Sequence, residues 1–147
     1  MRWIAAIGVL MALAGCGSHP GIRITDLPSE CVGDSGGLVK ALAAAPGRVL
    51  VGGRPISNCF RRGEDGAELQ ALGTGLLAAA QQLGDRARAG DDQAALRLGY
   101  LIGAARRGAR RSGLADELIR RLEAETSGLG AGRAAYQRGL RAGLTQG

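Results

Sequence analysis

Aromatic residues make up only 3% of this sequence, and apart from Trp3 they are Phe60, Tyr100 and Tyr136. A hydrophobic core in this chain must therefore be built mainly from Ala, Leu, Ile and Val side chains. The 147 residues allow one domain with a modest core. We therefore expect a single small domain whose interior is largely aliphatic.

The first residues form a short apolar segment. Arg2 and the free amino group give a positive start, and the thirteen residues Trp3–Gly15 that follow are apolar or small. A helix needs about 20 residues to cross a membrane, so this run is too short to span one, but it suits the hydrophobic region of an export signal. We therefore expect residues 1–15 to be a signal peptide that the mature protein lacks.

The end of this segment, Leu13-Ala14-Gly15-Cys16, resembles the lipobox of bacterial lipoprotein precursors. The resemblance covers the first sixteen residues. It implies that Cys16 becomes the first residue of the mature chain, with lipid on its sulfur and an acyl group such as palmitate on its amine. It further implies a lipid-anchored location on the extracytoplasmic side of the cell membrane or on the outer membrane. The alternatives are an ordinary secretory signal or a buried N-terminal helix, with Cys16 incidental.

Two further cysteines, Cys31 and Cys59, remain once Cys16 is lipidated. Two thiols in an exported chain most often pair with each other. Their disulfide would close a loop of about 29 residues and stabilise the fold by about 3–4 kcal/mol on the chain-entropy account. Two free buried thiols, or pairing with another chain, are the alternatives. Residues 16–30 are interpreted as a lipidated tether, because their glycines and prolines disfavour helix and sheet, and residues 31–147 as one helical domain.

The segment Gly33-Asp34-Ser35-Gly36-Gly37 resembles the surroundings of the nucleophile in trypsin-like serine proteases. That chemistry needs a histidine to take the proton of the serine and an aspartate to orient the histidine. The only histidine, His19, lies beside the expected lipid anchor, and none follows Ser35. We therefore interpret the segment as a turn in which Asp34 or Ser35 caps a short helix over residues 38–45.

A short β-ribbon is predicted after that helix. Pro46-Gly47 ends the helix, Arg48–Val51 is interpreted as a strand, and Gly52-Gly53 as a tight turn. Pro55–Phe60 is interpreted as the return strand, with Cys59 on it. Because a two-stranded ribbon is marginal by itself, the disulfide and helix packing would have to hold it.

From Glu64 onward, apolar side chains recur at spacings of three and four residues, which predicts helices. We expect one that ends at Gly90, followed by helices over about 92–111, 114–125 and 134–144. The predicted fold is mainly α, a small helical bundle of about four to five helices with a short β-ribbon near the N-terminus stapled by a disulfide. The expected buried stripes are Leu69, Leu72, Leu76, Ala79, Leu83 and Ala87 in the first of these helices, and Ala94, Ala95, Leu98, Leu101, Ile102, Ala105 and Ala109 in the second.

Acidic pairs indicate where these helices begin, and glycines indicate where one of them contacts a neighbour. Asp91-Asp92 and Asp116-Glu117 lie where helix starts favour acidic side chains. Gly99 and Gly103 are one turn apart and have the small-xxx-small form of close helix contacts. Because a mid-helix glycine costs about 1 kcal/mol relative to alanine, we expect a neighbouring backbone to approach here. We expect that neighbour to be the Ala-rich preceding helix.

Four arginines gather at the end of the second long helix. Helical geometry directs Arg97, Tyr100, Arg107 and Arg111 away from the apolar stripe, whereas Arg106 and Arg110 flank it. We predict that an anionic lipid surface or an anionic envelope polymer binds this cluster. The alternative is that these cations simply complement the helix dipole, by about 0.3–1 kcal/mol each. The predicted binding residues are Arg106, Arg107, Arg110 and Arg111.

The sequence offers little for catalysis or metal binding. One histidine and two cysteines expected to pair cannot supply the three or four nitrogen or sulfur ligands of a zinc site. No phosphate-binding loop is evident, and a body with three aromatic residues is poorly suited to a sugar cleft. The net charge of +6 would suggest nucleic acid in a cytosolic protein, but an exported chain rarely meets nucleic acid.

We therefore predict a membrane-anchored envelope lipoprotein that acts as a non-enzymatic binding or structural module without a cofactor. Its expected contacts are the membrane, through the lipid on Cys16, an anionic lipid or envelope polymer, and an envelope protein. The alternative is a cell-envelope hydrolase with an unrecognised carboxylate site. A buried, convergent cluster of Glu64, Asp65 or Glu68 would favour that alternative.

Overall fold

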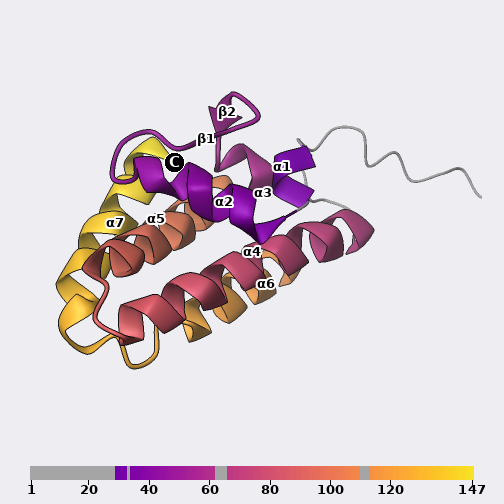
Figure 1. Cartoon of the computed structure of the whole chain (residues 1–147). Helices are drawn as coiled ribbons and strands as arrows, with labels where there is room; N and C mark the ends of the chain where they lie inside the picture. Colours follow the sequence, from indigo (N-terminus) through magenta and orange to yellow (C-terminus); the bar gives the residue numbers. More distant parts are fainter. Residues whose placement is uncertain (1–28, 33, 62–65, 110–112) are drawn as a thin grey trace, which may run out of the picture.

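The structure is a computed structural model that describes residues 29–32, 34–61, 66–109 and 113–147. The fold is mainly helical, with a two-stranded antiparallel ribbon and a Cys31–Cys59 disulfide, as the sequence predicts. Figure 1 shows the short N-terminal elements on one side of the body, against the longer helices that follow in the chain.

The N-terminal part consists of short elements. They are α1 (Ser29–Val32), α2 (Ser35–Ala41), the 3-10 helix η2 (Leu42–Ala44), β1 (Leu50–Val51), β2 (Arg54–Pro55) and α3 (Asn58–Arg61). Asp34 caps α2, because its side chain accepts a hydrogen bond from the main-chain nitrogen of Gly36 at 3.0 Å. The protease-like segment is therefore part of a helix cap, as expected, although the helix begins at Ser35 and tightens to 3-10 geometry at Leu42.

The ribbon is shorter than predicted. Gly52 and Gly53 have φ values of 55° and 75°, which suit the two-residue turn of a hairpin, and β1 pairs with β2 over two residues each. The predicted return strand beyond Pro55 is wrong, because Cys59 lies on α3. Ile56 and Cys59 are both buried. Three residues apart, their side chains would point to opposite faces of a strand, whereas one helical turn brings both to the same side.

The long helices follow the predicted positions closely. They are α4 (Gly66–Arg88), α5 (Asp92–Gly108), α6 (Gly113–Ala124), the 3-10 helix η3 (Gly130–Gly132) and α7 (Arg133–Gln146). Gly90 has a φ of 95°, which is not helical, and lies in the connection between α4 and α5. Asp91 then caps α5, because its side chain accepts a hydrogen bond from the main-chain nitrogen of Ala94 at 3.0 Å. The capping predicted for this acidic pair is confirmed at Asp91.

The core is largely aliphatic, as predicted, and runs between α4, α5, α6 and the N-terminal elements. The predicted stripes on α4 and α5 are buried, except that Ala109 is half-buried and the side chain of Leu69 lies outside the described part. The largest fully buried side chain is Tyr100. The prediction that Tyr100 points away from the core is therefore wrong, and Arg97 is half-buried too. A second helix covers this side of α5.

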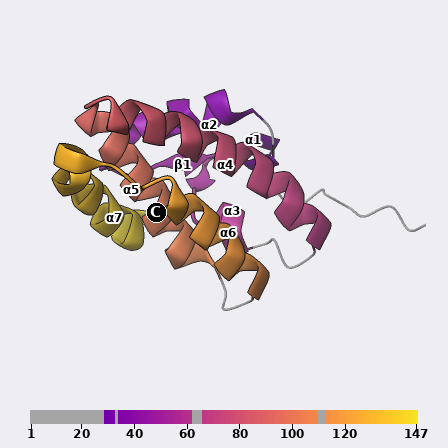
Figure 2. The ribbon, with the colours of Figure 1, turned by 90° about the horizontal axis from the view of Figure 1, so that it is seen from below.

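That second helix is α7, which lies beside α5 (Figure 2). A methyl group added at Gly99 would lie 2.9 Å from the main-chain nitrogen of Leu140, and one added at Gly103 would lie 2.8 Å from that of Leu144. Both distances are shorter than real Cβ atoms show, so the two backbones touch. The expectation that these glycines pack on the preceding helix is wrong, because their close neighbour is α7, far along the chain.

The contact is reciprocal. Methyl groups added at Gly139 and Gly143 of α7 would lie 2.9 Å from the main-chain nitrogens of Tyr100 and Ala104. Since residue numbers rise together along both helices, α5 and α7 run in the same direction. The glycines that lower the helix propensity of α7 are thus its contact surface with α5.

Candidate anionic-surface interface

The disulfide joins α1 to α3, with a Cα–Cα distance of 5.8 Å. Cys31 and Cys59 are 0% and 1% exposed. The predicted pairing is confirmed, and the bond joins the first of the short N-terminal helices to the last. Cys16, the predicted lipid attachment residue, lies outside the described residues.

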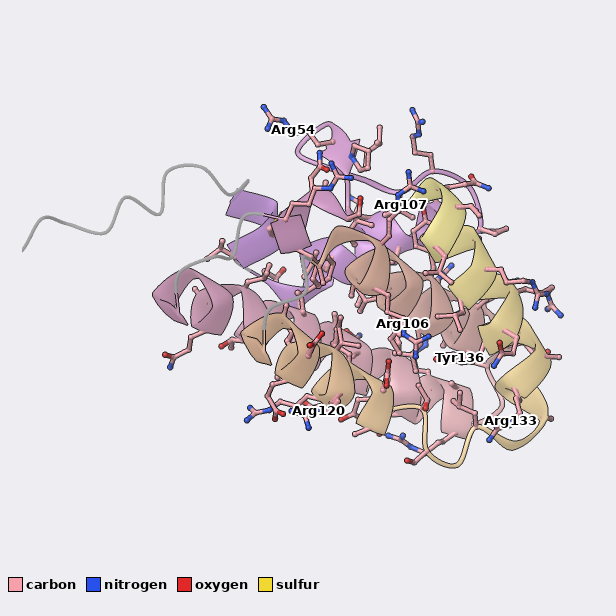
Figure 3. All side chains as sticks on the ribbon, turned by 180° about the vertical axis from the view of Figure 1, so that it is seen from behind. Arg54, Arg106, Arg107, Arg120, Arg133 and Tyr136 are labelled. Carbon is pink, nitrogen blue, oxygen red and sulfur yellow. A yellow bond between two sulfur atoms is a disulfide. The ribbon has the colours of Figure 1, made fainter. Side chains whose placement is uncertain are left out.

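Two members of the predicted arginine cluster are described, and both bind neighbouring helices. Arg106 donates two hydrogen bonds to Oε1 of Glu123 on α6, from Nε at 2.9 Å and from Nη2 at 2.6 Å. Arg107 donates from Nη1 to the main-chain oxygen of Leu144 at 3.1 Å and also to that of Thr145. These two arginines are labelled in Figure 3.

Arg106 and Arg107 therefore connect α5 to α6 and to the end of α7, respectively. Both side chains are nevertheless exposed, so each keeps a solvent-facing part beside its contact. The other two predicted cluster members, Arg110 and Arg111, lie outside the described residues.

Tyr136 of α7 lies near the ion pair of Arg106 and Glu123 (Figure 3). Burial raises the pKa of Tyr136, the Arg106 cation opposes this effect, and the Glu123 carboxylate adds to it. Its hydroxyl thus stays protonated at neutral pH. We interpret this corner, where α5, α6 and α7 meet, as a packed joint and not as an open charged surface.

The acidic side chains of α6 and of the α4–α5 connection also have basic neighbours. Glu117 binds Arg120 at 2.6 Å and Arg121 at 2.9 Å, and the hydrogen bond from Arg121 is the main cause that lowers the pKa of Glu117. Asp91 binds Arg86 at 2.6 Å. The pKa of Asp91 is lowered chiefly by its hydrogen bond from Ala94.

The hydrolase alternative depends on a cluster of Glu64, Asp65 or Glu68. Glu64 and Asp65 lie outside the described residues, as does the side chain of Glu68. Among the residues that the structure describes, no three His, Cys, Asp or Glu side chains form a group that could hold a metal ion. The described ion pairs of the carboxylates are Asp85–Arg88, Asp91–Arg86, Glu117 with Arg120 and Arg121, Glu123–Arg106 and Glu125–Arg88.

Helix α7 has a different charge pattern. It carries Arg133, Arg138 and Arg141, all exposed, and no Asp or Glu occurs between its ends. None of their three side chains forms an ion pair or a hydrogen bond with any described residue. At 100° per residue they lie within an arc of about 140°, and Arg133 and Arg141 are about 12 Å apart along the axis.

We call this set of arginines the α7 arginine face, and none of its members was among the predicted binding residues. Arg133 is labelled in Figure 3, near the start of α7. The signal was present in the sequence, since the predicted helix over 134–144 contains two arginines and no acid, a third arginine directly precedes it, and Gly139 and Gly143 are four residues apart. Because the glycines lower the helix propensity of this segment, its sequence did not indicate a charged helix side clearly.

Among the described helices, none is sufficiently long and apolar to cross a membrane. Comparisons of the chain with protein families, with curated proteins and with solved structures find no match. Function is therefore inferred from the residues and their geometry.

Proposed function

We propose that this protein is a membrane-anchored envelope lipoprotein whose folded domain acts as a non-enzymatic binding module. The observation that carries the proposal is the buried disulfide between Cys31 and Cys59. Structural disulfides persist in oxidising compartments and are rare in the cytosol. The disulfide thus supports export, which the lipobox-like segment ending at Cys16 implies independently.

The charge distribution supports binding. Most described carboxylates form ion pairs with arginines, as shown above, so the acidic residues of α6 are largely neutralised on the surface. The α7 arginine face has no such partner among the described residues. Free cations on one helix suit an anionic partner, and the surface of an anionic membrane attracts basic residues by about 1 kcal/mol each.

The anchor is tested by replacing Cys16→Ser and following maturation in the native host. We expect unprocessed or soluble protein that no longer enters the detergent phase, because serine has no thiol to be acylated. The matched control is Cys16→Ser combined with Ser18→Cys, which restores a cysteine two residues beyond the expected position and should not restore lipidation. A Cys16→Ser protein that is still processed and still partitions as a lipoprotein would contradict the proposal.

A further inference from the structure

We propose that the α7 arginine face, formed by Arg133, Arg138 and Arg141, is a docking surface for an anionic lipid bilayer. The choice of a bilayer as partner rests on the proposed function, because a lipid on Cys16 would hold the domain at a membrane. The choice of α7 as the surface rests on the contacts of the described residues and on the alignment of three arginines along one helix. Arg48, Arg54 and Arg61 of the N-terminal part are also exposed and form no described ion pair, but they lie on separate short segments.

The arginines of α6 and α7 differ in their partners among the described residues. Arg120 and Arg121 of α6 are exposed, but both bind Glu117, and Arg106 binds Glu123. An anion that approached α6 would therefore meet cations already paired with carboxylates. The side chains of Arg138 and Arg141 have no partner among the described residues, so lipid phosphates would not compete there with a described carboxylate.

Helix α7 is held against α5 by one side only. Gly139 and Gly143 press its inner side against the backbone of α5, which fixes the helix and leaves the opposite side exposed. Leu144 lies on that exposed side and is 41% exposed. By helical geometry it lies within about 60° of Arg141. A fixed row of cations beside an exposed leucine suits the boundary between headgroups and acyl chains.

The C-terminal end of α7 is covered by an arginine of α5. A helix ends in unpaired carbonyl groups that carry a partial negative charge and would repel anions. Arg107 of α5 donates hydrogen bonds to the carbonyl oxygens of Leu144 and Thr145. A full positive charge therefore covers this end. The N-terminal end of α7 is positive by its own dipole, so the helix favours anions along its whole length.

The length of the tether limits how far the domain can move from Cys16. Twelve residues lie between Cys16 and Ser29 at the start of α1, and a chain of this length can reach at most about 45 Å. A domain anchored at Cys16 therefore remains near the headgroups at a high effective concentration. Weak attraction by a few arginines is then enough to favour one orientation, with α7 toward the bilayer.

The test compares the reactivity of individual arginines in the full chain reconstituted on vesicles. Phenylglyoxal modifies accessible guanidinium groups, and peptide mass spectrometry reports the rate at each position. On vesicles that contain 30 mol% phosphatidylglycerol at low salt, we expect Arg133, Arg138 and Arg141 to react several-fold more slowly than on pure phosphatidylcholine. We expect Arg120 and Arg121 to react equally on both. Protection should disappear at 1 M salt, where the Debye length is about 3 Å.

Two double variants that each remove two charges complete the test. In Arg138→Gln/Arg141→Gln, the remaining Arg133 should lose its protection, because affinity for the anionic surface falls by about 30-fold when two cations are removed. In the matched control Arg120→Gln/Arg121→Gln, Arg133 should stay protected. The side chains of Arg138 and Arg141 form no described ion pair, and those of Arg120 and Arg121 form only exposed pairs with Glu117, which are worth about 0–1 kcal/mol. Circular dichroism should therefore show both variants folded.

Three results would overturn the proposal. They are equal reactivity of Arg133, Arg138 and Arg141 on neutral and anionic vesicles, equal protection of the α6 arginines, or protection by soluble polyphosphate but not by anionic vesicles. Failure of the anchor is a separate observation, since the chain would then fail to stay with neutral vesicles. The dependence on phosphatidylglycerol can still be measured in that case by adding vesicles in excess.

Discussion

The hydroxyl oxygen of Tyr100 accepts a hydrogen bond at 3.1 Å from the main-chain nitrogen of Val49, 51 residues earlier in the chain. Both residues are 0% exposed. The bond links the middle of α5 to the segment that leads into the β-ribbon. The largest fully buried side chain thus supplies the acceptor for a main-chain N–H beside the ribbon. The central helix and the N-terminal elements are therefore joined by a hydrogen bond as well as by apolar contacts.

We predict that Tyr100→Phe lowers the free energy of unfolding by about 1–3 kcal/mol, because it leaves the buried N–H of Val49 without an acceptor. Denaturant unfolding followed by circular dichroism measures the change. The matched control is Tyr136→Phe on α7, whose hydroxyl forms no hydrogen bond with any described residue. We expect that control to change stability by less than about 0.5 kcal/mol. Equal losses in the two variants would contradict a specific role for the Tyr100 bond.

The glycine contact between α5 and α7 predicts a large effect of one methyl group. Gly139→Ala would place a Cβ against the main chain of Leu96 and Tyr100, so the helices must separate. We expect a loss of about 3 kcal/mol or more, at or beyond the upper end of the usual cost of overpacking.

The matched control for this change is Gly37→Ala in α2, where an added Cβ meets nothing within 4 Å. A helical Gly→Ala change without steric cost should stabilise by about 0.5–1 kcal/mol. The melting temperatures of the two variants should thus move in opposite directions. A Gly139→Ala protein as stable as the parent would show that α7 does not contact α5 in this way.

The disulfide predicts resistance to alkylation and a loss of stability on removal. Cys31 and Cys59 should not react with a thiol reagent in unreduced protein taken directly from the envelope, because they are paired and buried. The double variant Cys31→Ala/Cys59→Ala should be less stable by about 3–4 kcal/mol, from the entropy of the opened loop. Two labelled cysteines in the native protein would refute the pairing in the cell.

The lowered pKa of Asp91 predicts a dependence of stability on pH. Because the pKa is below its ordinary value of 3.8 in the folded protein, the charged carboxylate stabilises the fold above that value. This contribution is lost as the pH falls through the folded pKa. At neutral pH, Asp91→Ala should cost about 1 kcal/mol as a lost helix cap, and the difference from the parent should decrease below pH 3.8.

Asp92→Ala provides the comparison for this prediction. Asp92 is exposed in the first turn of α5 and does not cap it, so we expect a cost of only about 0.3–1 kcal/mol through the helix dipole. Unfolding curves of the parent and both variants between pH 2 and pH 7 measure the difference. A cost for Asp91→Ala that does not change over this range would contradict the assigned role of its charge.

The sequence by itself determined the features that depend on local chemistry. Helix positions follow from the recurrence of apolar side chains, the start of α5 from the capping chemistry of Asp91, and the hairpin turn from Gly52 and Gly53. The pairing of Cys31 with Cys59 follows from their number in a chain expected to be exported. The aliphatic core follows from the scarcity of aromatic residues. Each of these inferences needs only neighbouring residues or a count, because propensity, capping and turn conformation are set within a few positions.

Only the tertiary structure decided which helix faces which, and the wrong predictions about Tyr100, Gly99 and Gly103 concern this question. Periodicity shows that one side of α5 is apolar, but Gly99 and Gly103 have no side chain to indicate a partner, so the cover that α7 gives to Tyr100 could not be predicted. The same holds for the arginines. Arg107 reaches the end of α7, whereas Arg138 remains without a described partner, because contacts between charges depend on which distant elements the glycine surfaces bring together.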